Sequence, residues 1–120
     1  MSLYILIHKR NNIEEAANCV YEELNRLYPD EVDCYDKGLF IVIDNIKIDF
    51  RCSLNRNRLA GIRPDFFYTN DESCYVNNLL QMSALPVDGK ELNSITQVIP
   101  IVTQYINLNR KIDEWLKSEV

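Results

Sequence analysis

The stretch that decides the fold reads LFIVIDNIKIDFR and occupies residues 39–51. Its first part, residues 39–43, is wholly apolar, which is typical of a buried strand. Asp44 and Asn45 then predict a two-residue turn. Residues 46–51 alternate strictly between apolar and polar side chains, as in a strand with one covered and one polar face. We therefore expect two consecutive strands joined by a tight turn.

Two more strands and several helices are predicted around this pair. Apolar runs at residues 3–7 and 66–68 predict the strands. The clearest helix is expected to begin at Asn12, which forms a capping-box pattern with Glu15, and to end at Pro29. Further helices are expected over residues 69–84 and 92–98 and from Pro100 onward.

The expected order of elements is β-α-β-β-β-α-α-α, with the acidic segment 30–37 as a connector. This order predicts an α/β fold: a single compact domain over residues 1–120, in which amphipathic helices pack on a small mixed sheet of about four strands. The helices from Asn12 and Pro100 are expected to bury one apolar stripe each against the sheet. The stripes consist of Ile13, Val20, Leu24, Ile101, Tyr105, Ile112 and Trp115.

Composition limits the class of protein. The chain has 120 residues, 47% of them hydrophobic, which excludes a disordered or collagen-like protein. No apolar run approaches the ~20 residues of a membrane span. The first eight residues lack the basic leader and cleavage site of a signal peptide. We therefore expect a cytoplasmic protein with no membrane partner.

Cysteine and histidine spacing argues against a metal site. Cys19, Cys34, Cys52 and Cys74 form no Cys-x-x-Cys pair, and His8 is the only histidine. The spaced pairs of a structural zinc site are therefore missing. We expect free, mostly buried thiols, no metal ligands and no cofactor.

One segment reverses the charge of this acidic chain, whose formal net charge is −5. Residues 51–63 contain four arginines and no acid, and two asparagines lie among them. Guanidinium groups bind carboxylates and phosphates in a forked geometry. The candidate binding residues are Arg51, Arg56, Arg58, Arg63, Asn55 and Asn57. An acidic protein surface is the favoured partner, since a sequence pI near 4.8 is unlike that of a general nucleic-acid binder. A nucleic acid, a phosphorylated ligand and simple surface solvation stay open as alternatives.

The segments 47–53, 58–65 and 66–72 together resemble the middle of phage large-terminase ATPase domains. They share a strand, a loop carrying Leu-x-Gly, and an apolar strand closed by an Asp-Glu pair. The resemblance implies that Asp71 and Glu72 hold magnesium and activate water. The phosphate-binding loop Gly-x-x-x-x-Gly-Lys-[Ser/Thr] is absent, so we expect no nucleotide hydrolysis. Helix capping explains Asp71 and Glu72 equally well.

Two other catalytic patterns are weaker. Pro64-Asp65 followed by Asp88-Gly89-Lys90 satisfies the text of the PD-(D/E)xK nuclease signature. We expect Lys90 to begin a helix, whereas that signature needs its lysine on a strand. His8, just past the first apolar run, has no recognisable serine or cysteine nucleophile near it in the sequence.

The sequence thus favours a non-enzymatic binding protein. The expected contact surface is the arginine segment 51–63 with the polar face formed by Lys47, Asp49 and Arg51. Thirteen isoleucines and thirteen asparagines against four alanines are typical of AT-rich coding. We therefore expect an accessory or inhibitor protein of a phage or a low-GC bacterium. The alternative is a metal-dependent phosphoryl-transfer enzyme, or a degenerate nuclease or ATPase relative, that uses Asp65, Asp71 and Glu72.

Overall fold

The computed structural model describes residues 2–53, 62–71 and 90–118. These residues form six strands and two long helices, with one-turn 3₁₀ helices at Asp36–Gly38 and Ile95–Gln97. The strands are β1 (Leu3–Lys9), β2 (Val32–Tyr35), β3 (Phe40–Ile43), β4 (Ile46–Cys52), β5 (Phe66–Thr69) and β6 (Lys90–Glu91). The helices are α1 (Ile13–Leu27) and α3 (Val98–Ser118).

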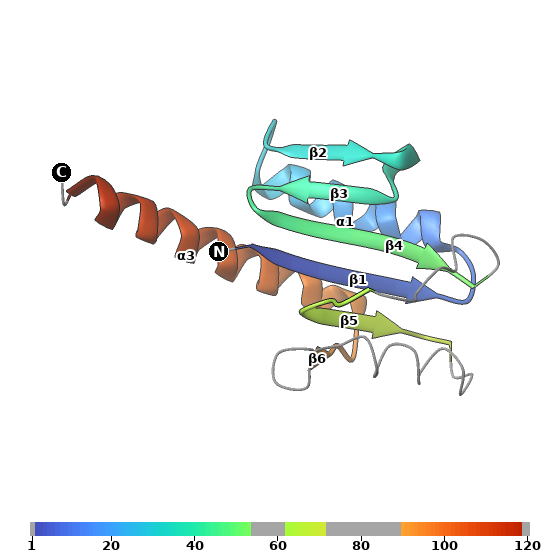
Figure 1. Ribbon diagram of the computed structural model, residues 1–120. Coiled ribbons are helices and arrows are strands. Elements are labelled where there is room, and N and C mark those ends of the chain that lie inside the picture. The colour runs from blue at the N-terminus through green and yellow to red at the C-terminus, as the bar shows by residue number, and fades with distance from the viewer. Residues whose placement is uncertain (1, 54–61, 72–89, 119–120) are drawn as a thin grey trace.

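All six strands form one mixed sheet in the order β2-β3-β4-β1-β5-β6 (Figure 1). The central strand β1 runs parallel to β4 and to β5, and β5 runs parallel to β6. The strands β2, β3 and β4 form an antiparallel meander, with the Asp44-Asn45 turn between β3 and β4. The predicted α/β class with a mixed sheet is confirmed.

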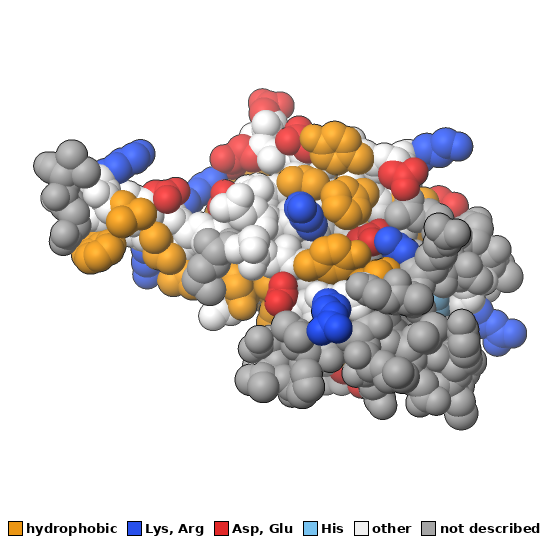
Figure 2. Space-filling model, viewed as in Figure 1, with side chains coloured by type: hydrophobic (Ala, Val, Ile, Leu, Met, Phe, Trp, Pro, Cys, Tyr) orange, Lys and Arg blue, Asp and Glu red, His pale blue; other side chains and the backbone are white. Residues whose placement is uncertain are grey.

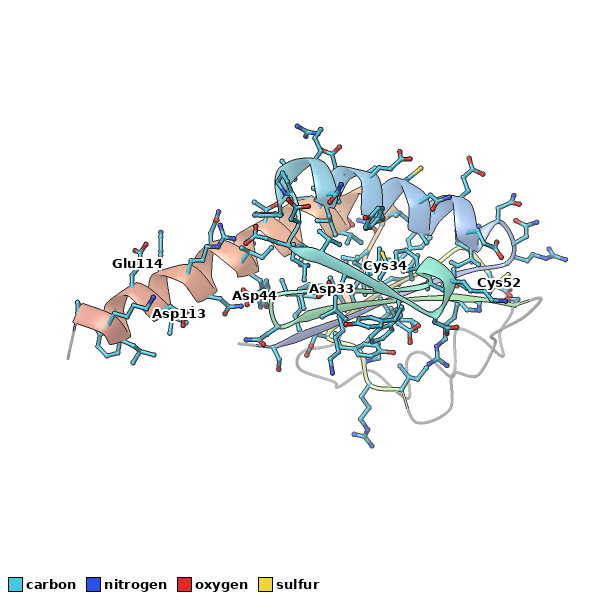
Figure 3. The ribbon with its side chains drawn as sticks, turned by 90° about the horizontal axis from the view of Figure 1, so that it is seen from above. Asp33, Cys34, Asp44, Cys52, Asp113 and Glu114 are labelled. Atoms are coloured by element: carbon cyan, nitrogen blue, oxygen red, sulfur yellow. The ribbon has the colours of Figure 1, made fainter. Side chains whose placement is uncertain are left out.

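Both helices pack on the same face of the sheet, as the view from above shows (Figure 3). Ile5 and Ile7 of β1 and Ile48 of β4 point to this side and are fully buried. Leu24 of α1 and Val102 of α3 cover them and are equally buried. The main core of the described residues therefore lies between the sheet and its two helices, while Leu6 and Phe67 are buried on the opposite face.

The opposite face of the sheet carries the alternate residues of each strand. It presents Tyr35 on β2 and Phe40 on β3, which are cross-strand partners, and Lys47 on β4. Tyr35 and Lys47 are exposed and Phe40 is half-buried. None of the helices in the described part of the chain lies on this face (Figure 1).

Two strands, β2 and β6, were not predicted because their sequences lack an apolar pattern. The segment Val32–Tyr35, expected to be part of a connector, forms the edge strand β2, and three of its four residues are exposed. Backbone pairing with β3 holds it in place. The two-residue strand β6 pairs with Phe66 and Phe67, so the prediction that Lys90 begins a helix is wrong.

The helix ends also differ from expectation. Asn12 precedes α1 in a left-handed conformation, with φ of 56°, and its side chain makes no capping hydrogen bond. The predicted capping box at Asn12 is therefore wrong. The helix expected over residues 92–98 is replaced by a one-turn 3₁₀ helix at Ile95–Gln97, and α3 begins directly after it at Val98. The capping box at the start of this turn is formed by Ser94 and Gln97. The expected helix over residues 69–84 lies outside the described residues from position 72 onward.

The long helix α3 extends beyond the sheet it covers (Figure 1). Its 21 residues span about 31 Å at 1.5 Å per residue. The expected burial of Leu24 is confirmed, with an exposed fraction of 0%. The expected burial of Ile112 and Trp115 is wrong, since 36% and 60% of these side chains are exposed. Both residues come after Asn109, the last buried residue of the helix.

The described cysteines are free thiols. Cys19, Cys34 and Cys52 are free, but only Cys52 is buried, so the expectation of mostly buried thiols is wrong for the part of the chain that is described. Within residues 2–53, 62–71 and 90–118, neither helix has the length and apolar character needed to cross a membrane.

Candidate functional site

Four polar side chains meet where the parallel strands β1, β4 and β5 end. His8 is the penultimate residue of β1, Ser53 follows β4, and Thr69 and Asp71 lie at and just after the end of β5. The Nδ1 atom of His8 lies 3.0 Å from Thr69 Oγ1, and its Nε2 atom lies 3.2 Å from Ser53 Oγ. Ser53 Oγ donates to Asp71 Oδ2 over 2.5 Å. The backbone N–H of Asp71 donates to Thr69 Oγ1 over 3.1 Å, which closes a ring.

The donors and acceptors of this ring require a proton on Nε2 of His8. The hydroxyl of Ser53 has one proton, and that proton goes to the carboxylate of Asp71. The contact between Ser53 and His8 therefore needs Nε2–H as the donor. The oxygen of Thr69 receives the Asp71 N–H, which leaves the Thr69 hydroxyl free to donate to Nδ1. A neutral histidine that carries its proton on Nε2 satisfies all four contacts, with Thr69 as the donor to Nδ1.

Burial favours the same neutral form. The side chain of His8 is fully buried, and desolvation lowers its pKa below the ordinary 6.5, while the charge of Asp71 acts in the opposite direction. A nucleophilic serine must instead donate its proton to histidine. Here Ser53 accepts a hydrogen bond from His8 and donates to Asp71. The ring therefore lacks the hydrogen-bond direction of a catalytic serine, and its role is to link the ends of three strands.

Hydrogen bonds of backbone N–H groups reinforce this link between the strand ends. Ser53 N–H donates to the carbonyl of Lys9 over 3.0 Å, and Arg10 N–H donates to Asn70 Oδ1 over 2.8 Å. Ser53 is the third residue of the arginine segment and the last described before Ile62. The start of the arginine segment is therefore fixed against β1 and the end of β5.

A second polar cluster lies on the same face of the sheet. Asp49 of β4 is only 2% exposed and accepts hydrogen bonds from the Tyr4 hydroxyl at 2.5 Å and from Arg51 Nε at 3.0 Å. Burial, followed by the bond to Asp49, raises the pKa of Tyr4 well above its ordinary value. Lys47, Asp49 and Arg51 do share one face as expected, but Asp49 is buried beneath its two partners.

The predicted binding residues are only partly placed. Arg51 is partly buried and paired with Asp49, whereas Arg63 is exposed. The other four candidates, Asn55, Arg56, Asn57 and Arg58, lie outside the described residues. The structure places Arg51 on the same face of β4 as the exposed Lys47, four residues apart, and does not describe Arg56 and Arg58.

The acids proposed for metal-dependent chemistry do not converge. Asp65 precedes β5, where its carboxylate accepts Tyr4 N–H at 2.9 Å and its own N–H donates to the Tyr4 carbonyl at 2.9 Å. Asp71 follows the other end of β5, about 20 Å away at 3.3 Å per residue. Glu72 lies outside the described residues. Among residues 2–53, 62–71 and 90–118, no group of three or more His, Cys, Asp or Glu side chains could hold a metal ion.

The nuclease pattern meets a related obstacle. Lys90 does lie on a strand next to β5, in register with Phe66, as that signature requires. However, the Asp65 carboxylate reaches toward β1, and β5 lies between β1 and β6. Asp88 and Gly89 are outside the described residues. The Asp65 carboxylate and the strand that carries Lys90 thus lie on opposite sides of β5.

Sequence reasoning missed Ser53 and Thr69 because neither belongs to a motif. The available signal was that each follows or ends a strand whose carboxyl end lies at the same edge as His8. Comparison with protein-family models, curated proteins and solved structures finds no match to this chain.

Proposed function

We propose that this protein is a non-enzymatic binding protein whose partner is a protein with an acidic surface. The observation that carries the proposal is the sheet face opposite the helices, next to the point where the arginine segment leaves the sheet. Among the described residues no helix covers this face, and it combines apolar, aromatic and cationic side chains (Figure 2).

The aromatic and apolar part of the face lies on the meander. Tyr35, 55% exposed, pairs across strands with the half-buried Phe40, and Val42 lies two residues further along β3. Tyrosine and phenylalanine are enriched in the buried centres of protein interfaces. These three side chains would give a partner an apolar anchor on an otherwise polar surface.

The cationic part lies on β4. Lys47 is exposed and pairs in register with Val42, and Arg51 is the first residue of the arginine segment. The exposed Asp33 lies on β2, at the edge of the sheet, and is the cross-strand partner of Val42 on β3. Positive charge therefore increases from β2 toward β4, which would orient an acidic partner over β4 and the arginine segment.

The polar ring supports a binding role over catalysis. Ser53 donates to Asp71 and not to His8, and Asp65 and Asp71 lie at opposite ends of β5. We extend the proposal to a cytoplasmic accessory or inhibitor protein of a phage or low-GC bacterium, on the strength of the isoleucine and asparagine excess.

The test is backbone NMR shift mapping with an oligoglutamate peptide as the acidic probe. We expect shifts that cluster at Lys47, Arg51 and Arg63. The double substitution Arg56→Ala with Arg58→Ala should weaken peptide binding and change folding stability by less than about 0.5 kcal/mol. The matched control is Arg26→Ala, which removes one exposed cation from α1 on the other side of the molecule.

Parallel titrations separate the alternatives. Stronger binding of a single-stranded oligonucleotide, or of inorganic phosphate, would replace the acidic protein as the partner. Magnesium-induced shifts at Asp65 and Asp71 would favour the phosphoryl-transfer enzyme. Full peptide affinity in the double variant would place the contact surface elsewhere.

A further inference from the structure

The strand β2 has a neighbour on one side only. It is the outermost strand of the sheet and pairs with β3 (Figure 1). Three of its four residues are exposed. An edge strand presents main-chain N–H and C=O groups that can pair with a further strand. We call the side of β2 that faces away from β3 the free edge.

The register of the meander shows which way the backbone groups of β2 point. Phe50 N–H donates to the Leu39 carbonyl over 2.9 Å, so this carbonyl points toward β4. The N–H of Phe40 belongs to the same planar peptide group and points the opposite way, toward β2. Phe40 is the cross-strand partner of Tyr35. The N–H and C=O groups of Tyr35 therefore point toward β3.

Alternation along the strand then identifies the groups at the free edge. Asp33 lies two residues before Tyr35, so its backbone groups also point toward β3, where its partner is Val42. Those of Val32 and Cys34 point outward. None of the described residues pairs with β2 on that side. The free edge therefore offers a further strand the N–H and C=O groups of these two residues.

The charge around the free edge is uniformly negative. Residues 30–36, which include β2, contain four acids and no lysine or arginine. The acids are Asp30, Glu31, Asp33 and Asp36, and all four are exposed. The carboxylate of Glu31 pairs with Arg110 of α3, in an ion pair that is itself exposed. An extended segment that pairs with this edge is therefore favoured if it is basic and repelled if it is acidic.

The spacing along β2 indicates which positions of such a segment are basic. Asp33 and Tyr35 lie two residues apart and share the face opposite the helices. Figure 3, seen from the side of β2, labels Asp33 and Cys34 on this strand. A cationic side chain beside Asp33 forms an ion pair, and a second one, two residues away, lies beside the exposed ring of Tyr35. The pattern basic-x-basic therefore fits this edge.

A second copy of β2 is a poor occupant of the same edge. Two-fold pairing of β2 with β2 brings two copies of residues 30–36 together, each with four acids and no cation. Like charges on facing strands destabilise the pairing. Charge on an edge strand is a common protection against such self-association, and it does not repel a basic strand.

We propose that the free edge of β2 binds an extended basic segment of another protein as an additional strand of the sheet. It is a second recognition surface, at the edge of the sheet and opposite in charge to the arginine segment. Because the edge is short and its charges are exposed, the expected binding is weak and decreases as salt is added. The test uses a basic probe, so its outcome is independent of the titration with oligoglutamate.

Backbone NMR with the synthetic peptide acetyl-Thr-Arg-Val-Arg-Thr-amide tests the proposal. We expect saturable shifts at Val32 and Cys34, together with slower hydrogen exchange of these two N–H groups, because each gains an acceptor. The matched probe is the same peptide with N-methylated backbone amides. It keeps the charge but loses its N–H donors, so it should bind much more weakly.

Two variants separate the charge from the backbone pairing. Asp33→Lys should raise the dissociation constant of the peptide about tenfold. Cys34→Pro removes an outward N–H and keeps the pairing with β3, since proline is tolerated where an edge strand faces solvent. It should weaken binding as well. The control is Glu114→Lys, which makes the same charge change on the end of α3, away from β2, and should leave the affinity nearly unchanged (Figure 3).

Four results would overturn the proposal. Equal binding of the N-methylated peptide would indicate charge attraction without strand pairing. Shifts that avoid β2 would place the peptide elsewhere, and full affinity in Asp33→Lys would exclude the acid as its partner. Concentration-dependent shifts at Val32 and Cys34 in the protein alone would identify a second copy as the occupant. Circular dichroism checks each fold, and Asp33→Lys, at an exposed side chain, decides alone if Cys34→Pro unfolds.

Discussion

At the scale of single residues, His8 shows how a buried titratable group can serve structure. Its two ring nitrogens contact Thr69 and Ser53, and Ser53 in turn donates to Asp71. These contacts join the ends of three strands that are far apart in the sequence. The histidine is best understood as a neutral linker between β1, β4 and β5.

This state of His8 predicts a pH dependence of stability. The pKa of His8 is lower in the folded protein than the 6.5 of an unfolded chain. The unfolded state therefore binds more protons near that pH, so the free energy of unfolding falls as the pH drops below about 6.5. The contribution of His8 is complete above this pH. Urea unfolding between about pH 5 and 8 should show the fall.

The variant His8→Gln separates this effect from carboxylate titration. It should be less stable at every pH, because Ser53 and Thr69 lose their hydrogen-bond partner, and its stability should vary less between about pH 6 and 7. An unchanged pH profile in this variant would contradict a lowered histidine pKa. Ser2→Ala, at an exposed serine, is the control and should match the wild type.

At the scale of elements, α1 contains a matched pair of leucines that tests the packing of the core. Leu24 is fully buried against the sheet, whereas Leu27, one turn later, is 39% exposed. Leu24→Ala should lower the free energy of unfolding by about 2–5 kcal/mol, because it leaves a cavity in the core. Leu27→Ala should cost far less. Equal losses in thermal or urea unfolding would show that α1 is not packed as described.

Elements were predictable where their pattern is local. The alternation of Ile46, Ile48 and Phe50 indicates β4 without any knowledge of its neighbours. The edge strand β2 has no such pattern, since Asp33 and Tyr35 are exposed and only backbone pairing with β3 defines it. Strands of this kind are therefore seen only once their partner is known.

Prediction from sequence failed at the carboxyl-terminal end of α3 and at the polar ring around His8, for different reasons. The periodicity of α3 correctly indicates an apolar face but carries no information on what covers it, so Trp115 was wrongly expected to be buried. The contacts of His8 with Ser53 and Thr69 depend on the register between β1 and two distant strands. Neither the extent of the sheet nor that register can be read from local spacing.

At the scale of the whole molecule, the connections bear on nucleotide binding. The described passages from a parallel strand into a helix are β1 to α1 and β6 to α3, and neither connection, residues 10–12 or residues 92–97, contains a glycine. A phosphate-binding loop needs a longer glycine-rich turn at such a place. We expect no tight binding of ATP, with or without magnesium, in isothermal calorimetry. A micromolar dissociation constant would contradict this expectation.

The central position of β1 has a consequence for biosynthesis. Strand β1 leaves the ribosome before its neighbours β4 and β5, so Leu3 can pair with Ile46, and Ile5 with Phe66, only after those later segments have been made. The meander β2-β3-β4, by contrast, is built from neighbouring segments and needs little loop closure. We therefore expect the meander to form first and the apolar strand β1 to be captured late. Until then the nascent chain exposes the apolar residues of β1, so this is the period in which it is most prone to aggregate.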